Sequence, residues 1–489
     1  MNAWTLLIPI LLPIIGGGCL YFFPVKNEKV QKTYIMSLVI LNSLIVYTML
    51  ILGVEGTCRA LTMAHDLTIH FHIDGFSKVF AGIIAGLWPL ATLYAFEYMK
   101  HEERNKLFFS FYTITYGVCI GIAFAANLMT LYMFYELLTL STLTLVIHKL
   151  DQPSIVAARK YMVYSFAGAA FAFIGFMFLL HYGTTTDFVY GGVLDMTKVS
   201  GQEDILLFIF VIAVLGFGVK AAIFPFHGWL PTASVAPTPV TALLHAVAVV
   251  KAGAFAIIRI TYYSFGTDFL RGTWAQTTIM FFAIVTILFA SSRAVKEIHL
   301  KRRLAYSTIS NLSYIVFSAS IMTPYGLEGS MAHMVTHAVM KITLFFCAGA
   351  IMHQTGKEYI YELKGIGKSM PFIMTCFTIG SAAVMGVPML CGFVSKWTII
   401  TAAVKSQNPY AFIGIAAILF SAFLTAVYLF SIVVKAFFRT EKLQDPVENQ
   451  DPNWYMKVPI CLLTGILVVI GVYSGPLMRF LGNIAFGRI

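Results

Sequence analysis

Two lysines stand inside apolar stretches, where a charged side chain is costly. Lys220 and Lys251 belong to residues 216–259, whose sequence is GFGVKAAIFPFHGWLPTASVAPTPVTALLHAVAVVKAGAFAIIR, and a proline-rich break separates them. A lysine in the middle of a membrane span is usually retained because it moves an ion or binds a substrate. Buried lysines can also exchange protons near neutral pH. The pattern therefore indicates movement of protons, or of sodium ions, along buried lysines.

Glu136, in the apolar stretch LYMFYELLTL, is a candidate counter-charge for Lys220. A carboxylate far from both membrane surfaces needs a cation nearby. Two interpretations stay open for the pair. It could be a permanent structural ion pair, or it could open and close and so change the proton affinity of Lys220.

Three ionisable residues recur four positions apart in HMVTHAVMKITLFF, namely His333, His337 and Lys341. Positions i, i+4 and i+8 stack on one face of a helix, which predicts a line of groups that can pass protons. The HxxxH spacing can also bind zinc, but the sequence has neither an HExxH glutamate nor an evident third ligand. No metal site is expected.

Three further residues are candidates for the same path. His227 follows Pro225 and could pass protons near neutral pH, although a cap or loop anchor fits its position equally well. His245 lies six residues before Lys251 and could relay to it or make an ordinary buried hydrogen bond. Lys396, in GVPMLCGFVSKW, would be the far end of the line.

The composition indicates which elements hold these residues. The chain has 489 residues, of which 59% are hydrophobic and 11% charged. Its apolar runs repeatedly exceed the roughly 18 residues of a membrane span, so we expect a single all-α, polytopic membrane domain with about fourteen transmembrane helices. The helices are expected at residues 4–22, 33–53, 78–99, 107–126, 128–148, 157–182, 204–226, 236–262, 276–295, 303–322, 329–354, 371–405 with a break, 411–438 and 456–475.

Basic residues alternate between the two sides of these helices. The connections on one side of the expected helices together hold twenty lysines and arginines. The connections on the other side, with both chain ends, hold six. Cytoplasmic loops are enriched in Lys and Arg, so both ends are expected outside the cytoplasm. The net charge of +11 then reflects membrane orientation, and no nucleic-acid partner is expected. The twenty are Lys26, Lys29, Lys32, Lys100, Arg104, Lys106, Lys149, Arg159, Lys160, Arg293, Lys296, Lys301, Arg302, Arg303, Lys357, Lys364, Lys368, Arg439, Lys442 and Lys457.

Other basic residues are expected to reach the membrane surface. Lys78, Arg259 and Lys435 lie close enough to helix ends for their charged groups to extend to the interface. The segment KRRLAYSTISNLSY, residues 301–314, joins a basic loop to a helix rich in hydroxyl groups. Its charge predicts orientation and lipid contact, and its Ser and Thr residues could hold water for a proton path or simply pack.

A short motif recurs beside two helix breaks. GFGVK at 216–220 returns as GFVSK at 392–396, each time near Pro and Gly in an apolar segment. The copies fall in the expected helices seven and twelve, which are an odd number of helices apart and so would have opposite orientations. Inverted repeats with broken helices line the ion sites of many transporters.

These residues resemble the antiporter-like membrane subunits shared by respiratory complex I, Mrp-type sodium/proton antiporters and energy-converting membrane-bound hydrogenases. The resemblance implies fourteen helices with two inverted five-helix repeats, at 107–262 and 276–438, and breaks in helices seven and twelve. The matching motifs are FYE at 134–136, KAAIFPFHGWLPTASVAPTPVTALLHAVAVVKAG at 220–253, KRRLAYSTISNLSY at 301–314, HMVTHAVMKITLFF at 333–346 and GVPMLCGFVSKW at 386–397.

The resemblance also implies roles for individual residues. Some family members carry glutamate where this chain has Lys396, so the lysine disfavours a strict match to the complex I M-type subunit. The long lateral helix of the L-type subunit does not follow the expected helix fourteen. A D-type Mrp-like subunit fits best. The matched positions are Glu136 and Lys220 for the glutamate–lysine pair, Lys251 for the central lysine, His337 and Lys341 for the helix-eleven relay, and Lys396 for the terminal group.

The expected function is translocation of protons or sodium ions by one subunit of a multi-subunit redox-driven pump or Mrp-type antiporter in the plasma membrane. Other membrane subunits would be its partners. Two alternatives stay open, a stand-alone secondary transporter of a small anionic solute and a non-conducting scaffold subunit. Seven scattered cysteines and the lack of flavin, nicotinamide or haem motifs indicate no cofactor, so any oxidoreductase activity would belong to partner subunits.

Overall fold

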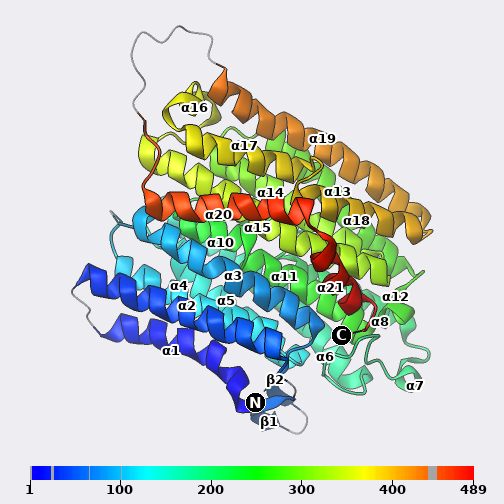
Figure 1. Ribbon diagram of the computed structural model, residues 1–489. Coiled ribbons are helices and arrows are strands. Elements are labelled where there is room, and N and C mark those ends of the chain that lie inside the picture. The colour runs from blue at the N-terminus through cyan, green and yellow to red at the C-terminus, as the bar shows by residue number, and fades with distance from the viewer. Residues whose placement is uncertain are drawn as a thin grey trace.

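The computed structural model describes residues 3–23, 27–54, 56–64, 67–100, 102–438 and 449–488, which form a bundle of long helices (Figure 1). The first elements are η1 (Ala3–Leu7), α1 (Ile8–Phe22), α2 (Glu28–Leu52), β1 (Cys58–Ala64), β2 (Leu67–Phe71), α3 (Gly75–Tyr98), α4 (Asn105–Ala123), α5 (Leu128–Val146), α6 (Gln152–Tyr182), α7 (Met196–Val199) and α8 (Glu203–Gly218). The middle elements are η2 (Phe226–Gly228), α9 (Trp229–Ala233), α10 (Thr238–Ala246), α11 (Val249–Ile258), the π-helical η3 (Arg259–Phe265), α12 (Thr267–Leu270), α13 (Trp274–Lys296), α14 (Leu300–Ser320) and α15 (Pro324–Thr355). The last are η4 (Ile360–Leu363), α16 (Ile366–Ser369), α17 (Pro371–Met385), α18 (Cys391–Lys405), α19 (Pro409–Phe437), α20 (Trp454–Val472) and α21 (Gly475–Ala485).

Eleven helical stretches in the described ranges are long and apolar enough to cross a membrane. A helix suits this setting because it satisfies its own backbone groups without water. The predicted all-α polytopic fold is confirmed, apart from one β-hairpin, β1–β2, in the connection between α2 and α3. The count of fourteen stays a prediction, because α8, α14, α17 and α18 are too short or not apolar enough to meet the same criterion.

Short polar side chains start several of these helices. Asp74, Asn127 and Asp151 accept hydrogen bonds from the backbone amides of Ser77, Thr130 and Ser154, at the starts of α3, α5 and α6. Such caps satisfy amide groups that have no partner inside the helix. The caps therefore fix where these three helices begin.

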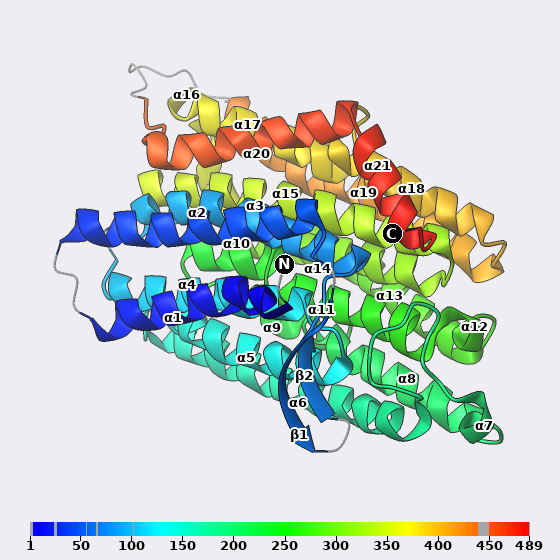
Figure 2. The same ribbon diagram turned by 60° about the horizontal axis from the view of Figure 1, so that its bottom comes forward.

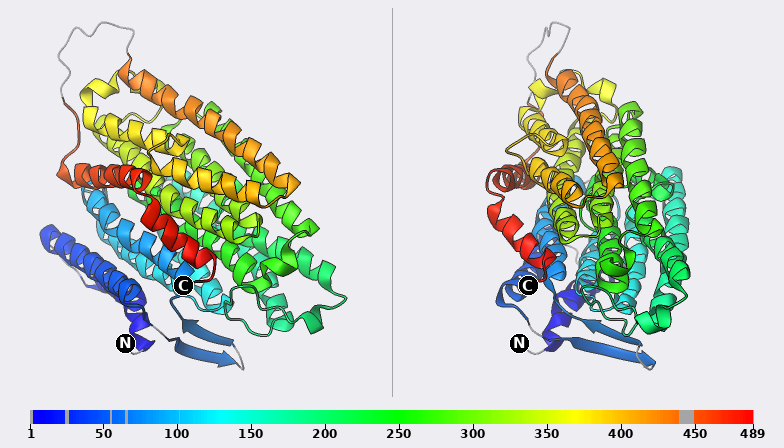
Figure 3. Two further views of the ribbon diagram at one scale, coloured as in Figure 1. Left: turned by 45° about the vertical axis from the view of Figure 1, so that its right-hand side comes forward. Right: turned by 90° about the vertical axis from the view of Figure 1, so that its right-hand side faces the viewer.

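The helix α15 runs through the middle of the bundle (Figure 3). It packs against α3, α10, α14, α17, α18, α20 and α21. Together with residues 238–265 it is one of the two most deeply buried spans. Polar groups on these two spans are therefore kept away from lipid by the surrounding helices.

Alternate connections gather at opposite ends of the bundle. At one end, where the hairpin projects (Figure 2), His70 Nε2 lies 3.0 Å from Asp187 Oδ1. At the other end His299 Nε2 lies 3.3 Å from Glu358 Oε2. This arrangement matches the alternation of loops in the sequence. Membrane orientation stays a prediction, and Lys26, Arg439 and Lys442 lie outside the described residues.

Arg259 does not extend to the membrane surface, so that prediction is wrong. It is 1% exposed, and its guanidinium binds both carboxylate oxygens of Asp74 as well as Ser77 Oγ, the last at 2.9 Å. It also lies 4.6–5.2 Å from the centroids of four aromatic rings. Burial acts to raise the pKa of Asp74, but the neighbouring Arg259 outweighs it and holds that pKa at about 2. The arginine has a partner inside the protein and no need of the interface.

The prediction of lipid contact is also wrong for two residues of the basic segment 301–303. Lys301 is buried and donates to the carbonyl of Ala236 at 3.0 Å. Arg303 is buried and donates to the carbonyl of Tyr428 at 2.8 Å. Arg302, between them, is exposed. These two cations fasten α14 to the segment before α10 and to α19.

Candidate functional site

Lys220 lies where the helix α8 has ended. The chain after Gly218 leaves the helical path, with Ala222 in the left-handed region at φ 57°, before the short turn η2. The indole of Trp229 donates to the carbonyl of Val219 at 2.7 Å and holds this irregular stretch in place. Non-helical backbone at membrane depth occurs where it is buried in protein or lines an ion path. The predicted break beside Lys220 is present in the structure.

The ammonium of Lys220 is directed at α5. It donates to the carbonyl oxygen of Tyr135 and lies 3.4 Å from the centroid of the Tyr135 ring. Glu136 is the residue after Tyr135. Among the described residues, the Glu136 carboxylate and the Lys220 ammonium do not form an ion pair within 4.0 Å. One Glu136 oxygen, Oε1, is buried without a hydrogen-bond partner among the described residues. The expected partners are neighbours, and the lysine is held by a main-chain carbonyl.

The segment expected as one helix at 236–262 is broken in two. The helix α10 ends at Ala246, α11 begins at Val249, and the amide of Ala248 donates to the carbonyl of Leu243, five residues back. The stretch between α10 and α11 contains neither Gly nor Pro, so the sequence offers no signal for the break. His245 and Lys251 consequently lie on different helical segments.

The helix α11 packs closely on the Lys220 break. A Cβ atom at Gly253 would lie 2.5 Å from the backbone nitrogen of Ala221, which only a glycine allows. Lys251, two residues before Gly253, is fully buried. The two lysine-bearing segments therefore touch through their backbones.

Lys251 reaches the central helix α15. Its Nζ lies 2.5 Å from Nδ1 of His337, and both side chains are fully buried. His333 lies one turn away on the same face of α15, with the two imidazole centroids 5.8 Å apart. The Nε2 atoms of both histidines have no partner among the described residues. The predicted stacking of ionisable groups on one face is present.

His333 connects this line to α18. Its Nδ1 lies 2.9 Å from the hydroxyl of Ser395, which also accepts a hydrogen bond of 2.9 Å from Thr336. Lys396 follows Ser395 directly and donates to the carbonyls of Val384 and Met385 at 2.7 and 3.0 Å. These are the last carbonyls of α17, which carry the negative end of its helix dipole.

The turn between α17 and α18 depends on Gly386. This residue has φ 95°, and a Cβ there would lie 3.1 Å from Cδ of Lys396. A side chain would therefore be strained and would press on the lysine. The turn and the lysine position are coupled.

The ammonium of Lys341 contacts a group of hydroxyls and, among the described residues, makes no hydrogen bond towards Lys396. Its Nζ donates to Ser307 Oγ at 2.5 Å, and Ser307 also accepts from the hydroxyl of Tyr428 at 2.7 Å. The Tyr428 hydroxyl lies 3.2 Å from Thr425 Oγ1. A second hydroxyl cluster lies nearby on α13, α14 and α19, formed by Ser291, Ser310, Tyr314 and Ser421.

The hydroxyl-rich segment 301–314 on α14 was noted from the sequence, but its partners on α13 and α19 were not singled out. Ser307, Ser310 and Tyr314 recur at i, i+3 and i+7 on α14, and Ser421, Thr425 and Tyr428 at i, i+4 and i+7 on α19. A hydroxyl stripe at helical spacing was therefore the available signal.

His245 and His227 stand apart from this line. His245 is fully buried, 4.7 Å from the ring of Phe345, and its Nε2 lies 3.5 Å from Ser234 Oγ. His227 is half-buried between the rings of Phe224 and Phe289. Within the described chain, neither histidine makes a direct hydrogen bond to Lys251. In the described ranges, no group of three His, Cys, Asp or Glu residues is arranged to hold a metal.

Two family profiles match the chain. Residues 125–425 match the family described as NADH:quinone oxidoreductase/Mrp antiporter, TM, and residues 61–109 match NADH-Ubiquinone oxidoreductase (complex I), chain 5 N-terminus. The first match covers more than half of the chain. The chain belongs to this family. The resemblance to this family is thereby confirmed, and the D-type assignment within it stays a prediction.

Curated relatives of this family member come from several assemblies. It is 30% identical over 96% of its length to a Na(+)/H(+) antiporter subunit of Alkalihalophilus pseudofirmus, and 28% identical over 95% to a probable K(+)/H(+) antiporter subunit of Rhizobium meliloti. It is 30% identical over 83% to an NADH-quinone oxidoreductase subunit of Desulforudis audaxviator. The chain spans 61%, 46% and 81% of these relatives' lengths, respectively.

Solved structures show the same fold along nearly the whole chain. A chain of the Mrp complex from Dietzia sp. DQ12-45-1b superposes with a TM-score of 0.87 at 18% identity, covering 99% of this chain and 97% of that one. A chain of the archaeal membrane-bound sulfane sulfur reductase gives 0.84 at 24%, covering 98% and 96%. A chain of respiratory complex I from Thermus thermophilus gives 0.81 at 22%, covering 99% and 98%. The architecture is therefore shared across all three.

Proposed function

We propose that this chain translocates protons as one membrane subunit of a multi-subunit antiporter or redox-driven pump. The observation that carries the proposal is the buried contact between Lys251 and His337, continued by His333 and Ser395 to the neighbourhood of Lys396. Ionisable groups inside a membrane protein are expensive to bury and commonly form proton paths. Four such groups, Lys251, His337, His333 and Lys396, make up the proposed route.

The route has a simple transfer chemistry. The ammonium of Lys251 gives a proton to Nδ1 of His337, and the resulting imidazolium releases a proton from Nε2. His333 takes up a proton on Nε2 and gives one from Nδ1 to the hydroxyl oxygen of Ser395, which passes on its own proton towards Lys396. Each step moves one proton and no electrons. Both imidazole Nε2 atoms lack a partner among the described residues, so the proposed transfer between the two rings requires either a bridging water or a closer approach of the rings.

Proton movement fits the ligands better than direct passage of sodium. Sodium is a hard cation, and hard cations in proteins are bound by oxygen ligands such as carboxylates and carbonyls. The line from Lys251 to Lys396 consists mainly of nitrogen groups that carry protons, and Glu136 is the nearby carboxylate that the sequence singled out. A counter-ion would then travel by another route in the assembly.

Glu136 and Lys220 are proposed to feed or gate this line. Lys220 is held by the carbonyl of Tyr135 and lies on a segment that packs against α11. If Glu136 approached, its carboxylate would compete with that carbonyl for the ammonium and change how readily Lys220 gives up its proton. His227 and His245 are proposed as side groups that pass protons to and from the line.

Two inverted repeats, at residues 107–262 and 276–438, are part of the same proposal. Each contains an interrupted helix with a lysine that donates to main-chain carbonyls, Lys220 in the first and Lys396 in the second. Unwound turns of this kind line ion sites in transporters built from inverted repeats.

The proposed setting is the plasma membrane, with both chain ends outside the cytoplasm and other membrane subunits as partners. The names of the relatives, which include antiporter and NADH-quinone oxidoreductase subunits, support an assembly of this type. The other subunits of the assembly would determine which electron donor or counter-ion it uses.

The test uses the chain purified with its co-purifying subunits and reconstituted in liposomes that contain a pH-sensitive dye. Lys251→Met and His337→Gln are expected to slow proton movement by about a hundredfold, the scale of a lost acid–base group. Lys435→Met, at the exposed end of α19, is the control. Unchanged proton movement in both variants would overturn the proposal. Uptake of an anionic solute by the chain alone, lost in Lys251→Met, would support the stand-alone transporter instead.

A further inference from the structure

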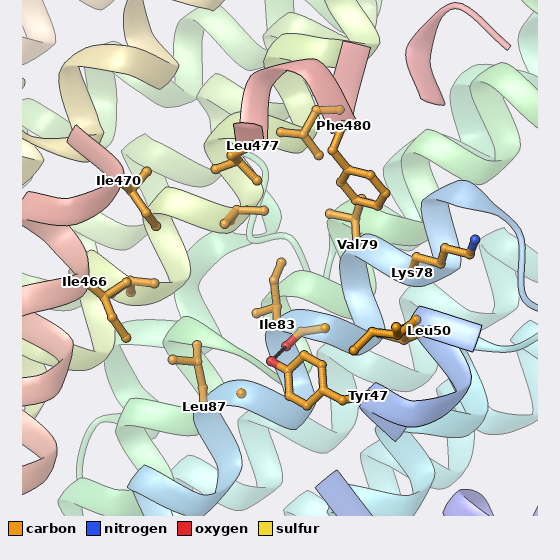
Figure 4. A pocket seen from close by; sticks show the side chains of 16 residues that line it. Tyr47, Leu50, Lys78, Val79, Ile83, Leu87, Ile466, Ile470, Leu477 and Phe480 are labelled. Carbon is orange, nitrogen blue, oxygen red and sulfur yellow. Dashed lines mark hydrogen bonds between the residues drawn. The ribbon is translucent and has the colours of Figure 1, made fainter. Parts of the chain in front are cut away.

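A groove of about 530 Å³ is lined by residues that include none of the lysines and histidines of the proposed line (Figure 4). Residues of α2, α3, α15, α20 and α21 form its walls. Figure 4 shows Ile466 and Ile470 of α20 and Leu477 and Phe480 of α21 across from Ile83 of α3. The lining is almost wholly apolar, so in a membrane the groove is suited to a hydrocarbon chain.

One cation stands at the end of this groove. Lys78, in the first turn of α3, lies at the rim, and its ammonium makes no hydrogen bond or ion pair with another described residue. Asp74, one turn earlier, is bound to Arg259 on the inner side of α3. Lys78 is therefore free to bind an anionic group from outside the chain.

The length of the groove matches one leaflet of a membrane. Its lining runs along α3 from Lys78 to Leu87, and the nine steps between these two residues span about 13 Å of helix. Half of a bilayer's hydrocarbon core is about 15 Å thick. A membrane-spanning helix of a partner would need a groove about twice as long, whereas one acyl chain needs only this depth.

We infer that this groove binds a phospholipid, with one acyl chain between α3 and the α20–α21 pair and the phosphate on Lys78. Gly82 makes room for the chain. Gly82 has no side chain, and a Cβ built there meets only Leu50, at an ordinary contact distance of 3.8 Å. Val335 and Val339 of α15 form part of the wall, on the face of that helix nearly opposite His333 and His337. The lipid would therefore pack against the back of the helix that carries the two histidines. The inference does not rest on the proposed function.

The experiment counts phospholipid bound to the full chain, purified with its co-purifying subunits and exchanged against vesicles of phosphatidylglycerol and phosphatidylcholine in equal amounts. Wild type is expected to retain a bound phospholipid through detergent washing, as measured by mass spectrometry and phosphate analysis. Gly82→Leu and Leu477→Trp fill the groove from opposite walls and are expected to lose it. Two variants are used so that misfolding of one does not decide the result.

A charge variant tests the site of the phosphate. Lys78→Gln is expected to lower retention of phosphatidylglycerol about fivefold, the scale of one lysine against an anionic lipid. Lys198→Gln, an exposed lysine at the same end of the bundle, is the control and should change nothing. Equal lipid retention in wild type and both filled variants would overturn the inference. Quantitative cross-linking of a Leu477→Cys variant to a partner subunit in the intact assembly would also overturn it, because a protein segment would then occupy the groove.

Discussion

Lys251 of α11 and His337 of α15 meet in the centre of the bundle, with 2.5 Å between the ammonium nitrogen and the imidazole Nδ1. Both side chains are fully buried, and they are 86 residues apart in the sequence. This contact joins the broken span of residues 238–265 to the central helix. It is the link on which the proposed proton route depends.

The first prediction is a double-mutant cycle across this link. Lys251→Met and His337→Gln are each expected to slow proton movement strongly, and the double variant should be little slower than either one. Residues in direct contact typically show coupling of about 0.5–3 kcal/mol, so the two effects should not add. The measurement is the initial rate of dye response in proteoliposomes. Additive losses would show that the two residues act independently.

The second prediction concerns the hydroxyls beside Lys341. Tyr428→Phe removes the hydroxyl that bridges Ser307 and Thr425, and is expected to cost about 1 kcal/mol of stability and to slow proton movement. Thr343→Val is the control, because this hydroxyl lies two residues after Lys341 and, among the described residues, bonds only to the carbonyl of Val339 within α15. Thermal unfolding and transport rate are measured for both. Equal transport in the two variants would exclude a role for the Ser307–Tyr428 pair.

The third prediction concerns the turn before Lys396. Gly386→Ala places a Cβ in a left-handed conformation and against the lysine side chain, so it is expected to destabilise the fold by about 1–2 kcal/mol. Gly465→Ala, in α20, is the matched control because its Cβ would meet nothing within 4 Å. Midpoints of thermal unfolding in detergent give the comparison. If the two variants melt alike, the turn tolerates a side chain and its coupling to Lys396 is absent.

The fourth prediction concerns the Asp74–Arg259 pair and pH. Asp74→Asn leaves a buried guanidinium without its counter-charge and is expected to cost about 3 kcal/mol. Because the folded pKa of Asp74 is about 2, below that of an unfolded aspartate, its contribution is complete above about pH 4 and is lost as the pH falls towards 2. The variant should therefore lose less stability than wild type over that interval.

The control for the fourth prediction is Asp151→Asn, the same change at the cap of α6. Asp151 has no arginine partner among the described residues, and Asn caps a helix as well as Asp. Its unfolding midpoint at pH 7 should stay near that of wild type. A similar loss in both variants would mean that the Asp74 cap, and not its pairing with Arg259, is what matters.

Periodicity and breaker residues predicted much of the site. The spacing of His333, His337 and Lys341 was enough to place them on one helix face, because four residues make about one turn. Gly386 and the prolines near Lys220 and Lys396 marked two of the helix interruptions. Local sequence carries this information, since it sets backbone conformation directly.

Tertiary partners could not be predicted in the same way. Arg259 lies near a helix end, which predicts snorkelling, but Asp74, 185 residues away, meets it inside the protein. Lys301 and Arg303 likewise find carbonyl oxygens on other segments. The interruption between Ala246 and Val249 has no Gly or Pro, so it too depends on packing around it.

That interruption gives His245 and Lys251 separate orientations. Because the helical hydrogen bonds do not run unbroken from Ala246 to Val249, the angle between the two side chains around the helix axis is not the one that six residues of a single helix would set. One span of chain thus directs the lysine to His337 and the histidine to Ser234 and Phe345.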